Sequence, residues 1–414
     1  MEEKEFVEKI RQAGGRIFIV GGWVRDTLRG AVPKDKDYVV VGLSADTFLR
    51  LFPAARQVGR GFPVYLLRID GKSSEIAFAR RERKTGPGYR GFAIEAAPAI
   101  TIEEDLYRRD TTMNSIAMEL PERQLLDPYG GRLAIEERRI AAVSGHFCED
   151  PVRALRAARQ AAELGFSITD ETFSLMRRCQ ADLLQEPPER LQQELERALQ
   201  TERPSVFFQA LERAGLLTVA FPELAALVGR QQPVEFHPEG DAFVHSLLVL
   251  DKTAAQTTNA AARFAALVHD LGKGTTPHSM EPHHYGHEER GLAELARWNA
   301  RGRLPRLWVQ CAALVIREHM RAPRLAKPGK IVALLLQVEQ SPLALDDFLA
   351  VIRSDHGPLP AYLEQAAVLL PALQAVSGRD CPAGLRGAAV GQWVREAQVR
   401  VCQAILPQLE SAGK

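Results

Sequence analysis

The sequence predicts an α+β fold in which a small mixed-sheet head precedes an all-helical neck, body and tail. Short apolar strands alternate with helices in the first third of the chain. After about Arg138 the apolar residues recur at helical spacing. Nine of the ten histidines lie between residues 237 and 356, which indicates a second functional module. At 414 residues the chain is too long for one ordinary core, so several domains are expected.

The local pattern predicts the elements of the head in order. An amphipathic helix is expected over residues 6–13, ended by Gly14 and Gly15, and an apolar strand over residues 16–20. The next helix, over residues 23–29, stops at Gly30. Further strands are expected over residues 38–41, 64–69 and 75–79.

Composition narrows the function classes. The formal net charge is +1, so a nucleic-acid partner would need a local basic patch. Five scattered cysteines without a Cys-x-x-Cys pair argue against a disulfide framework and a structural zinc site, and fit a reducing cytoplasm. The N-terminus does not resemble a signal peptide and no apolar run reaches membrane-spanning length, so no membrane partner is expected. The oligomeric state stays open.

Asp35 and Asp37 are the first candidate catalytic residues. A strand points residues i and i+2 to one face, so a strand here would hold both carboxylates side by side. Mg²⁺ prefers oxygen ligands and often combines one or two carboxylates with substrate phosphates. Glu75 could supply a third carboxylate from a neighbouring strand. The alternative is a solvated charged turn, which a lone Asp-x-Asp would favour.

The glycine pair Gly21-Gly22 favours the metal site over the solvated turn, because it lies between an expected strand and an expected helix. Glycine permits a positive φ and a close approach of the backbone, and a helix N-terminus attracts anions. Arg25 is badly placed for the helix dipole and makes more sense as a phosphate ligand. These features predict metal-dependent phosphoryl chemistry on a nucleotide.

Five motifs occur in order along the chain. They are Gly21-Gly22-Trp23-Val24-Arg25-Asp26, Asp35-Lys36-Asp37, Arg108-Arg109-Asp110-Thr111-Thr112-Met113-Asn114, Glu149-Asp150-Pro151-Val152-Arg153 and Glu189-Arg190-Leu191-Gln192-Gln193-Glu194. In this order they resemble the bacterial class II CCA-adding tRNA nucleotidyltransferases of the polymerase-β superfamily. The resemblance runs from about Arg16 nearly to the end.

The resemblance implies addition and repair of the 3′-terminal C-C-A of tRNA from CTP and ATP, with Mg²⁺ in the head and release of pyrophosphate. It implies a nucleotidyltransferase head over residues 1–140, a helical neck with a base reader over 141–230, an HD phosphohydrolase domain over 231–360 and a helical tail over 361–414. The implied nucleotide-binding residues are Gly21, Gly22, Arg25, Arg109, Asp150, Arg153, Arg156 and Arg159. Other implied motif residues are Asp110, Asn114, Glu149, Glu189, Arg190 and Glu194.

The side chains of Asp150 and Arg153 are chemically suited to recognise the base of the incoming nucleotide. A helix would place residues three apart on neighbouring parts of one face. A carboxylate accepts from the exocyclic amino group of cytosine or adenine, whereas uracil and guanine present a keto oxygen that it repels. The alternative is a surface ion pair. The basic segment of residues 80–90 resembles the mobile loop that helps the pocket change from C to A. Gln160 departs from the family, which usually has an aromatic residue there.

A second site is expected among the clustered histidines. His245, His269-Asp270 and Asp355 follow the order of HD-domain phosphohydrolases. Imidazole and carboxylate ligands suit a divalent transition metal such as Ni²⁺, and such a metal can activate water. Lys273, His287 and His319 would extend the site or contact phosphate. The resembled subgroup is credited with phosphatase, 2′-nucleotidase and 2′,3′-cyclic phosphodiesterase activities. An inactive relic is the competing interpretation.

Three other functions compete with full C-C-A addition. A bacterial poly(A) polymerase shares the head motifs, although the segment of residues 58–64 is closer to the CCA type. A metal phosphohydrolase whose head only binds nucleotide or RNA is the second. The third is a division of labour, in which a separate enzyme adds part of C-C-A.

Overall fold

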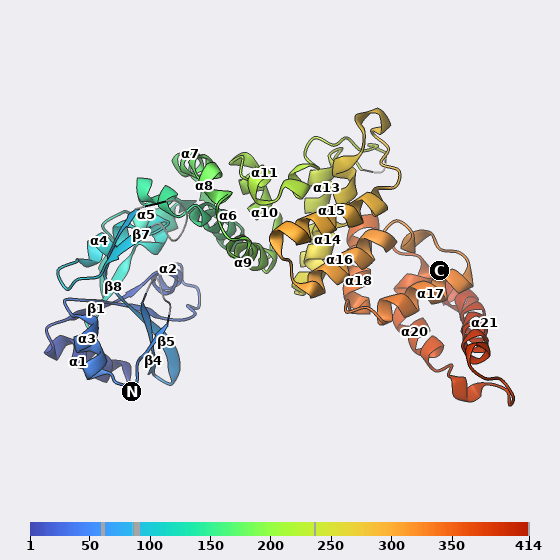
Figure 1. Ribbon diagram of the computed structural model, residues 1–414, viewed down its shortest axis with the longest axis horizontal. Helices are drawn as coiled ribbons and strands as arrows, with labels where there is room; N and C mark the ends of the chain where they lie inside the picture. The colour runs from blue at the N-terminus through green and yellow to red at the C-terminus, as the bar shows by residue number, and fades with distance from the viewer. Residues whose placement is uncertain (59–62, 85, 87–91, 236, 413–414) are drawn as a thin grey trace. The chain divides into compact units, whose positions relative to one another are not determined.

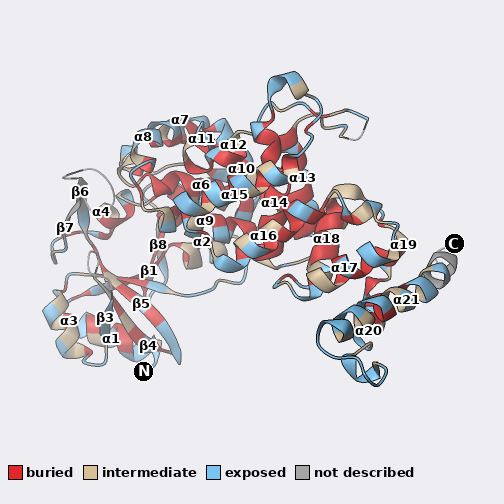
Figure 2. Ribbon diagram, turned by 45° about the vertical axis from the view of Figure 1, so that its right-hand side comes forward, coloured by how far each residue is buried: buried red, intermediate tan, exposed pale blue. Residues whose placement is uncertain are grey.

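The computed structural model describes residues 1–58, 63–84, 86, 92–235 and 237–412. The chain forms two compact units (Figure 1). The first contains Met1–Glu194 and Gln209–Ala220, and the second contains Leu195–Phe208 and Phe221–Lys414. Buried residues run through the strands of the first unit and the central helices of the second (Figure 2). The predicted class, a mixed-sheet head followed by helices, is confirmed. The division into four segments stays a prediction.

A seven-stranded sheet forms the centre of the head, in the order β3-β4-β5-β2-β1-β8-β9. Strands β2 and β5 run parallel, whereas the other neighbouring pairs are antiparallel. The strands are β1 (Arg16–Val20), β2 (Asp37–Val41), β3 (Arg56–Val58), β4 (Val64–Ile69), β5 (Lys72–Phe78), β8 (Ala117–Leu120) and β9 (Gln124–Leu126). The expected strands over residues 16–20 and 64–69 are therefore confirmed to the residue.

Helices cover both faces of this sheet. On one face α1 (Glu3–Gln12) brings Phe6 against Tyr38, with ring centroids 5.5 Å apart, and α3 (Ala45–Leu51) brings Phe48 against Phe78 at the same separation. On the other face α4 (Ile102–Tyr107) contributes to a buried cluster with Phe18, Val20 and Val39. Alternate residues of each strand thus face two cores, which fixes the register.

The expectation that Asp35 and Asp37 lie side by side on one strand is wrong. Strand β2 begins at Asp37, and residues 32–36 have no regular structure. The physical reason lies in the neighbouring strands. Asp37 pairs with Val20, the last residue of β1, after which Gly21 takes a φ of 72° and turns the chain into a helix. Asp35 therefore has no opposite residue in β1.

The rest of the first unit is largely helical. Asp150 was expected on the same helix as Arg153, which is wrong. Asp150 has an extended backbone, because the residue before a proline is disfavoured in the α region, and Pro151 caps the helix that follows. The elements that lie wholly in this unit are α2 (Gly22–Leu28), β6 (Arg81–Lys84), β7 (Phe92–Glu95), η1 (Thr112–Asn114), α5 (Gly131–Glu136), β10 (Arg139–Ile140), η2 (Gly145–Glu149), α6 (Val152–Leu164), β11 (Ser167–Ile168), α7 (Asp170–Arg178), α8 (Gln180–Leu183) and α11 (Leu217–Ala220). Helices α9 (Pro188–Leu199) and α10 (Ser205–Arg213) have residues in both units.

The regular elements described in the second unit are all helices, joined by turns and loops. Aromatic packing marks its core, where Phe264 lies 5.5 Å from Trp298 and 5.0 Å from Trp308 between ring centroids. No helix among the described residues has both the length and the apolar character that a membrane span requires. The elements are α12 (Pro222–Ala225), α13 (Ala242–Ala254), α14 (Ala260–Val268), η3 (Leu271–Thr275), η4 (His278–Met280), α15 (His287–Gly302), α16 (Arg306–Glu318), η5 (Ala322–Arg324), α17 (Pro328–Glu339), α18 (Leu345–His356), α19 (Ala361–Glu364), α20 (Ala366–Gln374), η6 (Gly378–Asp380) and α21 (Ala388–Ala412).

Candidate active sites

The first unit contains a cavity of about 920 Å³ that gathers most of the motif residues. Arginines outnumber carboxylates by eight to five among its lining residues, so it suits a polyanion such as a nucleoside triphosphate. The lining residues that the sequence predicted are Gly21, Gly22, Arg25, Asp37, Arg109, Asp110, Asn114, Asp150, Arg153, Arg156, Arg159, Glu189 and Arg190.

Asp37, the first residue of β2, supplies the cavity with a carboxylate. Glu75 lies directly opposite it in the register of β5, so the two side chains share one face of the sheet. Reduced hydration and the charge of Glu75 raise the pKa of Asp37 to about 6, although Arg109 opposes the shift. Two neighbouring carboxylates are a suitable donor set for Mg²⁺.

Asp35 and Glu75 are not among the lining residues of this cavity. Asp35 instead lines a separate hollow of about 210 Å³ with Trp23, Lys36 and Ser73. Its charge still contributes to the raised pKa of Asp37. The structure therefore brings Glu75 opposite Asp37 across the strand pair and leaves Asp35 on the irregular segment before β2.

Arg25 is buried and fixed on three sides at the start of α2. Its Nε and Nη2 donate to Asp26 over 2.9 and 3.0 Å, and its Nη1 donates to Oδ1 of Asn114 over 3.1 Å. The preceding Gly21 adopts the positive φ that a side chain would make costly. The glycine turn and the arginine thus lie together at the cavity wall, as predicted.

Arg109 is held through Asp105, a buried carboxylate on α4. Its Nη2 donates to Oδ2 of Asp105 over 3.1 Å. Its buried Nε has no hydrogen-bond partner among the described residues. Burial opposes ionisation of Asp105, but the charges of Arg108 and Arg109 outweigh it and lower the pKa of that carboxyl. Arg109 therefore keeps one donor that an anionic ligand could satisfy.

Asp110 is the buried centre of a polar network that joins η1 to α6. Its Oδ1 accepts from Asn114 over 3.2 Å, and its Oδ2 accepts from Arg156 over 2.9 Å and from Gln160 over 3.2 Å. Gln160 in turn accepts from Thr111 over 3.3 Å. The residue that departs from the family pattern is thus a buried polar link between Thr111 and Asp110.

Asp150 contacts both Arg190 and Arg153, and the backbone nitrogen of Arg153 donates to the carbonyl of Asp150 over 3.0 Å. Oδ2 of Asp150 accepts from Arg190 over 2.8 Å, while Arg153 donates to the carbonyl of His146 over 2.6 Å. Arg159 pairs with Glu194 over 2.6 Å. Asp150 and Arg153 still line the same cavity.

Of the remaining expectations for the head, Arg80 of the basic loop lines the cavity, whereas Glu149 and Glu194 do not. Glu149 pairs with His146 over 2.9 Å, and Glu194 acts behind Arg159. Strands β6 and β7 form an antiparallel pair at the two ends of the basic loop of residues 80–90. Residues 85 and 87–91 of that loop lie outside the described residues.

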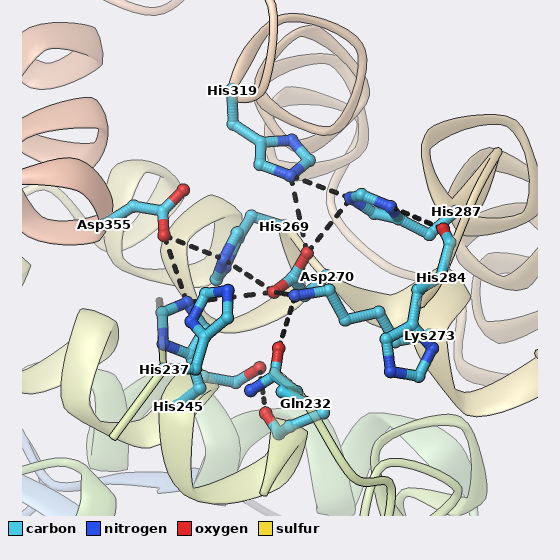
Figure 3. A network of polar contacts seen from close by, with 12 residues as sticks. Gln232, His237, His245, His269, Asp270, Lys273, His284, His287, His319 and Asp355 are labelled. Atoms are coloured by element: carbon cyan, nitrogen blue, oxygen red, sulfur yellow. Dashed lines mark hydrogen bonds and ion pairs between the residues drawn. The ribbon is translucent and has the colours of Figure 1, made fainter. Parts of the chain in front are cut away.

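The second unit gathers all the predicted HD residues in one buried cluster (Figure 3). His245 lies on α13, His269-Asp270 follows α14, and Asp355 lies near the end of α18. Nε2 of His245 is 3.0 Å from Oδ1 of Asp355, and Nε2 of His269 is 3.2 Å from Oδ2 of Asp270. Ligand atoms of His245, His269 and Asp270 lie within 4.8 Å of one another.

His287 and His319 approach the other oxygen of Asp270. Their Nε2 atoms lie 3.2 and 3.4 Å from Oδ1 of Asp270, so this carboxylate faces histidines on both sides (Figure 3). Ligand atoms of these three residues also lie within 4.8 Å of one another. Burial opposes ionisation of Asp270, but the charges of His269 and Lys273 outweigh it and hold its pKa well below the usual range.

The donor set fits a divalent transition metal. Nε2 of His269 and Oδ1 of Asp270 are buried and have no hydrogen bond of good geometry among the described residues. Nδ1 of His269 is turned to the carbonyl of Ala266 at 2.8 Å, which leaves Nε2 available as a ligand. Neutral imidazole and carboxylate are the ligands such metals prefer.

Close backbone packing supports this cluster. A Cβ added to Gly272 of η3 would lie 2.0 Å from the carbonyl oxygen of His287 and 2.4 Å from the nitrogen of Gly291. The segment after His269-Asp270 therefore touches α15 backbone to backbone, and only glycine fits there.

Sequence reasoning missed two supporting residues. Gln232 accepts from Nζ of Lys273 over 2.5 Å, and Glu239 lies 2.5 Å from Nδ1 of His245. Both belong to the loop before α13, where no motif or periodicity marks them. The cavity beside the cluster measures about 1280 Å³ and includes Asp270, Lys273, His287 and Asp355 in its wall.

Comparison with known families agrees with this arrangement. Residues 17–141 match the "Poly A polymerase head domain", residues 165–227 the "Probable RNA and SrmB- binding site of polymerase A", and residues 242–375 the "HD domain". These matches define the class, an enzyme with a nucleotidyltransferase head and an HD domain.

Relatives named "Multifunctional CCA protein" match nearly the whole chain. That of Nitrosococcus oceani is 41% identical over 401 residues, which cover 93% of this chain and 97% of that protein. That of Thioalkalivibrio sulfidiphilus is 41% identical over 409 residues, with coverage of 94% and 98%. The chain belongs to the family of multifunctional CCA proteins.

Solved structures show the same fold. The Bacillus stearothermophilus CCA-adding enzyme in complex with CTP aligns with a TM-score of 0.63 at 23% identity, covering 98% of this chain and 92% of that one. The Thermotoga maritima CCA-adding enzyme complexed with tRNA aligns with a TM-score of 0.66 at 17% identity, covering 99% and 94%.

Proposed function

We propose that the first site adds and repairs the 3′-terminal C-C-A of tRNA, using CTP and ATP and releasing pyrophosphate. The observation that carries this proposal is the single cavity shared by Asp37, the phosphate-type arginines and the Asp150–Arg153 motif. One nucleotide bound in this cavity could therefore contact both the residues proposed for phosphoryl transfer and the pair proposed to read its base. The names of the relatives support the same reaction.

The roles follow from the contacts. Asp37 and Glu75 would hold Mg²⁺, with Asp35 close enough to add its charge. The ion, when bound, activates the attacking 3′-hydroxyl and neutralises charge at the α-phosphate. Arg109, with its free Nε, and Arg25 bind the phosphate chain, while the positive φ of Gly21 lets the backbone approach it.

Base selection is assigned to Asp150 and Arg153. The carboxylate accepts from the amino group of cytosine or adenine and rejects the keto oxygens of uracil and guanine. Arg190 orients Asp150 from behind, and Arg156 and Arg159 are held toward the cavity by Asp110 and Glu194. The loop of residues 80–90 is proposed to help the change from C to A.

The test uses tRNA that lacks the three terminal nucleotides. The protein is given CTP alone, ATP alone, or both, and the products are sized on a sequencing gel. C-C from CTP and C-C-A from both are expected. Long A runs on any RNA without use of CTP would indicate a poly(A) polymerase. Addition of only C or only A would indicate a division of labour with another enzyme.

We infer that the second site is a metal-dependent phosphohydrolase for phosphomonoesters and 2′,3′-cyclic phosphates, with Ni²⁺ a suitable metal. His245, His269, Asp270 and Asp355 form its ligand set, and His287 and His319 complete a second set around the other oxygen of Asp270. A metal bound there activates water for attack on phosphorus. Lys273, held between Asp270 and Gln232, places a positive charge beside the cavity.

Hydrolysis of a 2′,3′-cyclic nucleotide with added Ni²⁺, compared with a chelated sample, tests this inference. Activity that needs the metal and disappears in His269→Ala supports it. A loaded protein that hydrolyses neither phosphomonoesters nor cyclic phosphates would indicate the inactive relic.

A further inference from the structure

We propose that Glu239 is a positioning residue that orients His245 for metal binding. The inference rests on the metal-binding function proposed for the second site. It concerns a loop, residues 228–241, that lies between the two family matches ending at residue 227 and beginning at residue 242. The region that matches the HD domain, residues 242–375, does not include this loop.

The geometry places Glu239 on the outer side of the imidazole. Its Oε1 lies 2.5 Å from Nδ1 of His245. On the inner side, Nε2 of the same ring lies 3.0 Å from Oδ1 of Asp355 and 3.8 Å from Oδ2 of Asp270. A carboxylate that accepts from Nδ1–H fixes the tautomer in which Nε2 carries the free lone pair, and it makes that nitrogen a better ligand.

The Nδ1 partner of His245, Glu239, differs in kind from those of the other histidines in the cluster. His269, His287 and His319 orient their rings by turning Nδ1 to backbone carbonyls, those of Ala266, His284 and Ile316, at 2.8 to 3.0 Å. His269 and His319 lie at the C-terminal ends of α14 and α16, where carbonyls lack a helical partner, whereas the carbonyl of His284 also accepts from the backbone nitrogen of His287 over 3.1 Å.

The position of His245 differs, because it lies one turn inside the start of α13. The preceding carbonyl of Asp241 already accepts from the backbone nitrogen of His245 over 2.9 Å, and that of Ala242 accepts from the hydroxyl of Ser246 over 3.0 Å. The observed partner of Nδ1 at this position is a side chain from outside the helix, that of Glu239.

The loop that carries Glu239 is closed by its own hydrogen bonds and contacts the site through Gln232, which accepts from Lys273. Its ends are joined by a hydrogen bond from the backbone nitrogen of Gln232 to the carbonyl of Gly240, 2.9 Å long, and Asp241 accepts from the backbone nitrogen of Gly229 over 2.6 Å. The carbonyl of Gln231 also contacts Nε2 of His284 at 2.9 Å. The loop is thus built as a supporting layer around the cluster.

A separate ion bound by Glu239 is the competing interpretation. Ligand-type atoms of His237, Glu239 and His245 lie within 4.8 Å of one another. An ion there would take Nδ1 of His245 while the inner site takes Nε2. Both ring nitrogens would then bind metal, which requires an imidazolate that has lost both protons. A hydrogen bond to Nδ1–H requires no such step, so orientation is favoured.

The experiment measures Co²⁺ binding to the full chain by competition with a chromophoric chelator. Glu239→Gln keeps the shape of the side chain and removes its charge, and Glu239→Ala removes the acceptor entirely. Both are expected to bind Co²⁺ roughly 10- to 100-fold more weakly, with the number of ions bound at saturation unchanged. Glu235→Gln, on the same loop and exposed, is the matched control and should bind like the unaltered protein. Melting temperatures in EDTA check that all variants fold.

Unchanged affinity in both Glu239 variants would overturn the inference. So would a loss of one bound ion at saturation, because Glu239 would then be a ligand. Absence of Co²⁺ binding by the unaltered protein would contradict the metal site itself and this inference with it.

Discussion

The two sites hold their functional side chains in opposite ways. In the head, arginines are tied to carboxylates: Arg25 to Asp26, Arg109 to Asp105, and Arg156 to Asp110, while Asp37 remains exposed at a strand end. In the HD cluster, imidazoles are turned by backbone carbonyls and by Glu239, and the ligands are nearly inaccessible.

This difference fits the metal ions proposed for the two sites. Mg²⁺ takes few protein ligands and completes its shell with water and substrate phosphates, so its site must stay open. A transition metal held by imidazole and carboxylate obtains most of its shell from the protein, so a buried, preorganised cluster suits it.

The largest expected effect separates the two aspartates of the head. Asp37→Ala should lower incorporation of CTP and ATP into tRNA by about three orders of magnitude or more, because it removes the cavity carboxylate proposed to hold Mg²⁺. Asp35→Ala, outside the cavity, should cost less. Incorporation rates at saturating tRNA and nucleotide check both variants, with the exposed Asp46→Ala as control. Equal losses would show that both aspartates bind the same ion during catalysis.

The next prediction asks whether the sites are independent. His269→Ala and Asp270→Ala should reduce cyclic phosphodiesterase activity by roughly two to three orders of magnitude, since each removes a ligand of the cluster. Incorporation of CTP and ATP should be unaffected. His278→Ala, whose side chain is 85% exposed, is the control. Loss of both activities together would contradict two separate sites.

A third prediction concerns the stability of the tied network in the head. Burial alone would raise the pKa of Asp110, but Arg156, Asn114 and the backbone of Thr111 outweigh it and lower the pKa. The stabilisation is therefore full above the unfolded pKa of about 4 and is lost as the pH falls.

Asp110→Asn should lower the free energy of unfolding at pH 7 by roughly 2–3 kcal/mol and should flatten the decline between about pH 5 and pH 3. Urea denaturation at several pH values measures this change. The exposed Asp170→Asn should differ by less than about 1 kcal/mol at every pH. A parallel decline in the Asp110 variant would argue against an ionised carboxylate.

The smallest predicted change is in base selection. Asp150→Asn offers an amide that can accept or donate, so the preference for CTP over UTP should fall roughly tenfold. Ratios of kcat/KM for the two nucleotides on the same tRNA measure it, and Glu171→Gln on the exposed surface is the control. A loss of rate with unchanged preference would assign Asp150 to structure alone.

The sequence was sufficient for features that depend on local pattern or on ordered motifs. The apolar runs at residues 16–20 and 64–69 predicted their strands, and the ordered motifs predicted most of the residues that line the first cavity, although Asp35, Glu149 and Glu194 are not among them. It could not show that β2 starts at Asp37, because that limit comes from the end of pairing with β1. Nor could it find Glu239 or the link through Gln160, because both act through contacts between segments distant in sequence.

The contact at Gly272 has a consequence for how the HD site could change during evolution. The spacing between Asp270 and His287 depends on the lack of a side chain at Gly272, because a Cβ there would lie 2.0 Å from the carbonyl oxygen of His287. The glycine at position 272 therefore sets the distance between the two backbones. Gly272→Ala would push α15 outward and would separate Asp270 from His287 without changing either residue. A lineage that no longer needs hydrolysis could lose the site through this single hydrogen-to-methyl exchange, leaving every histidine in place.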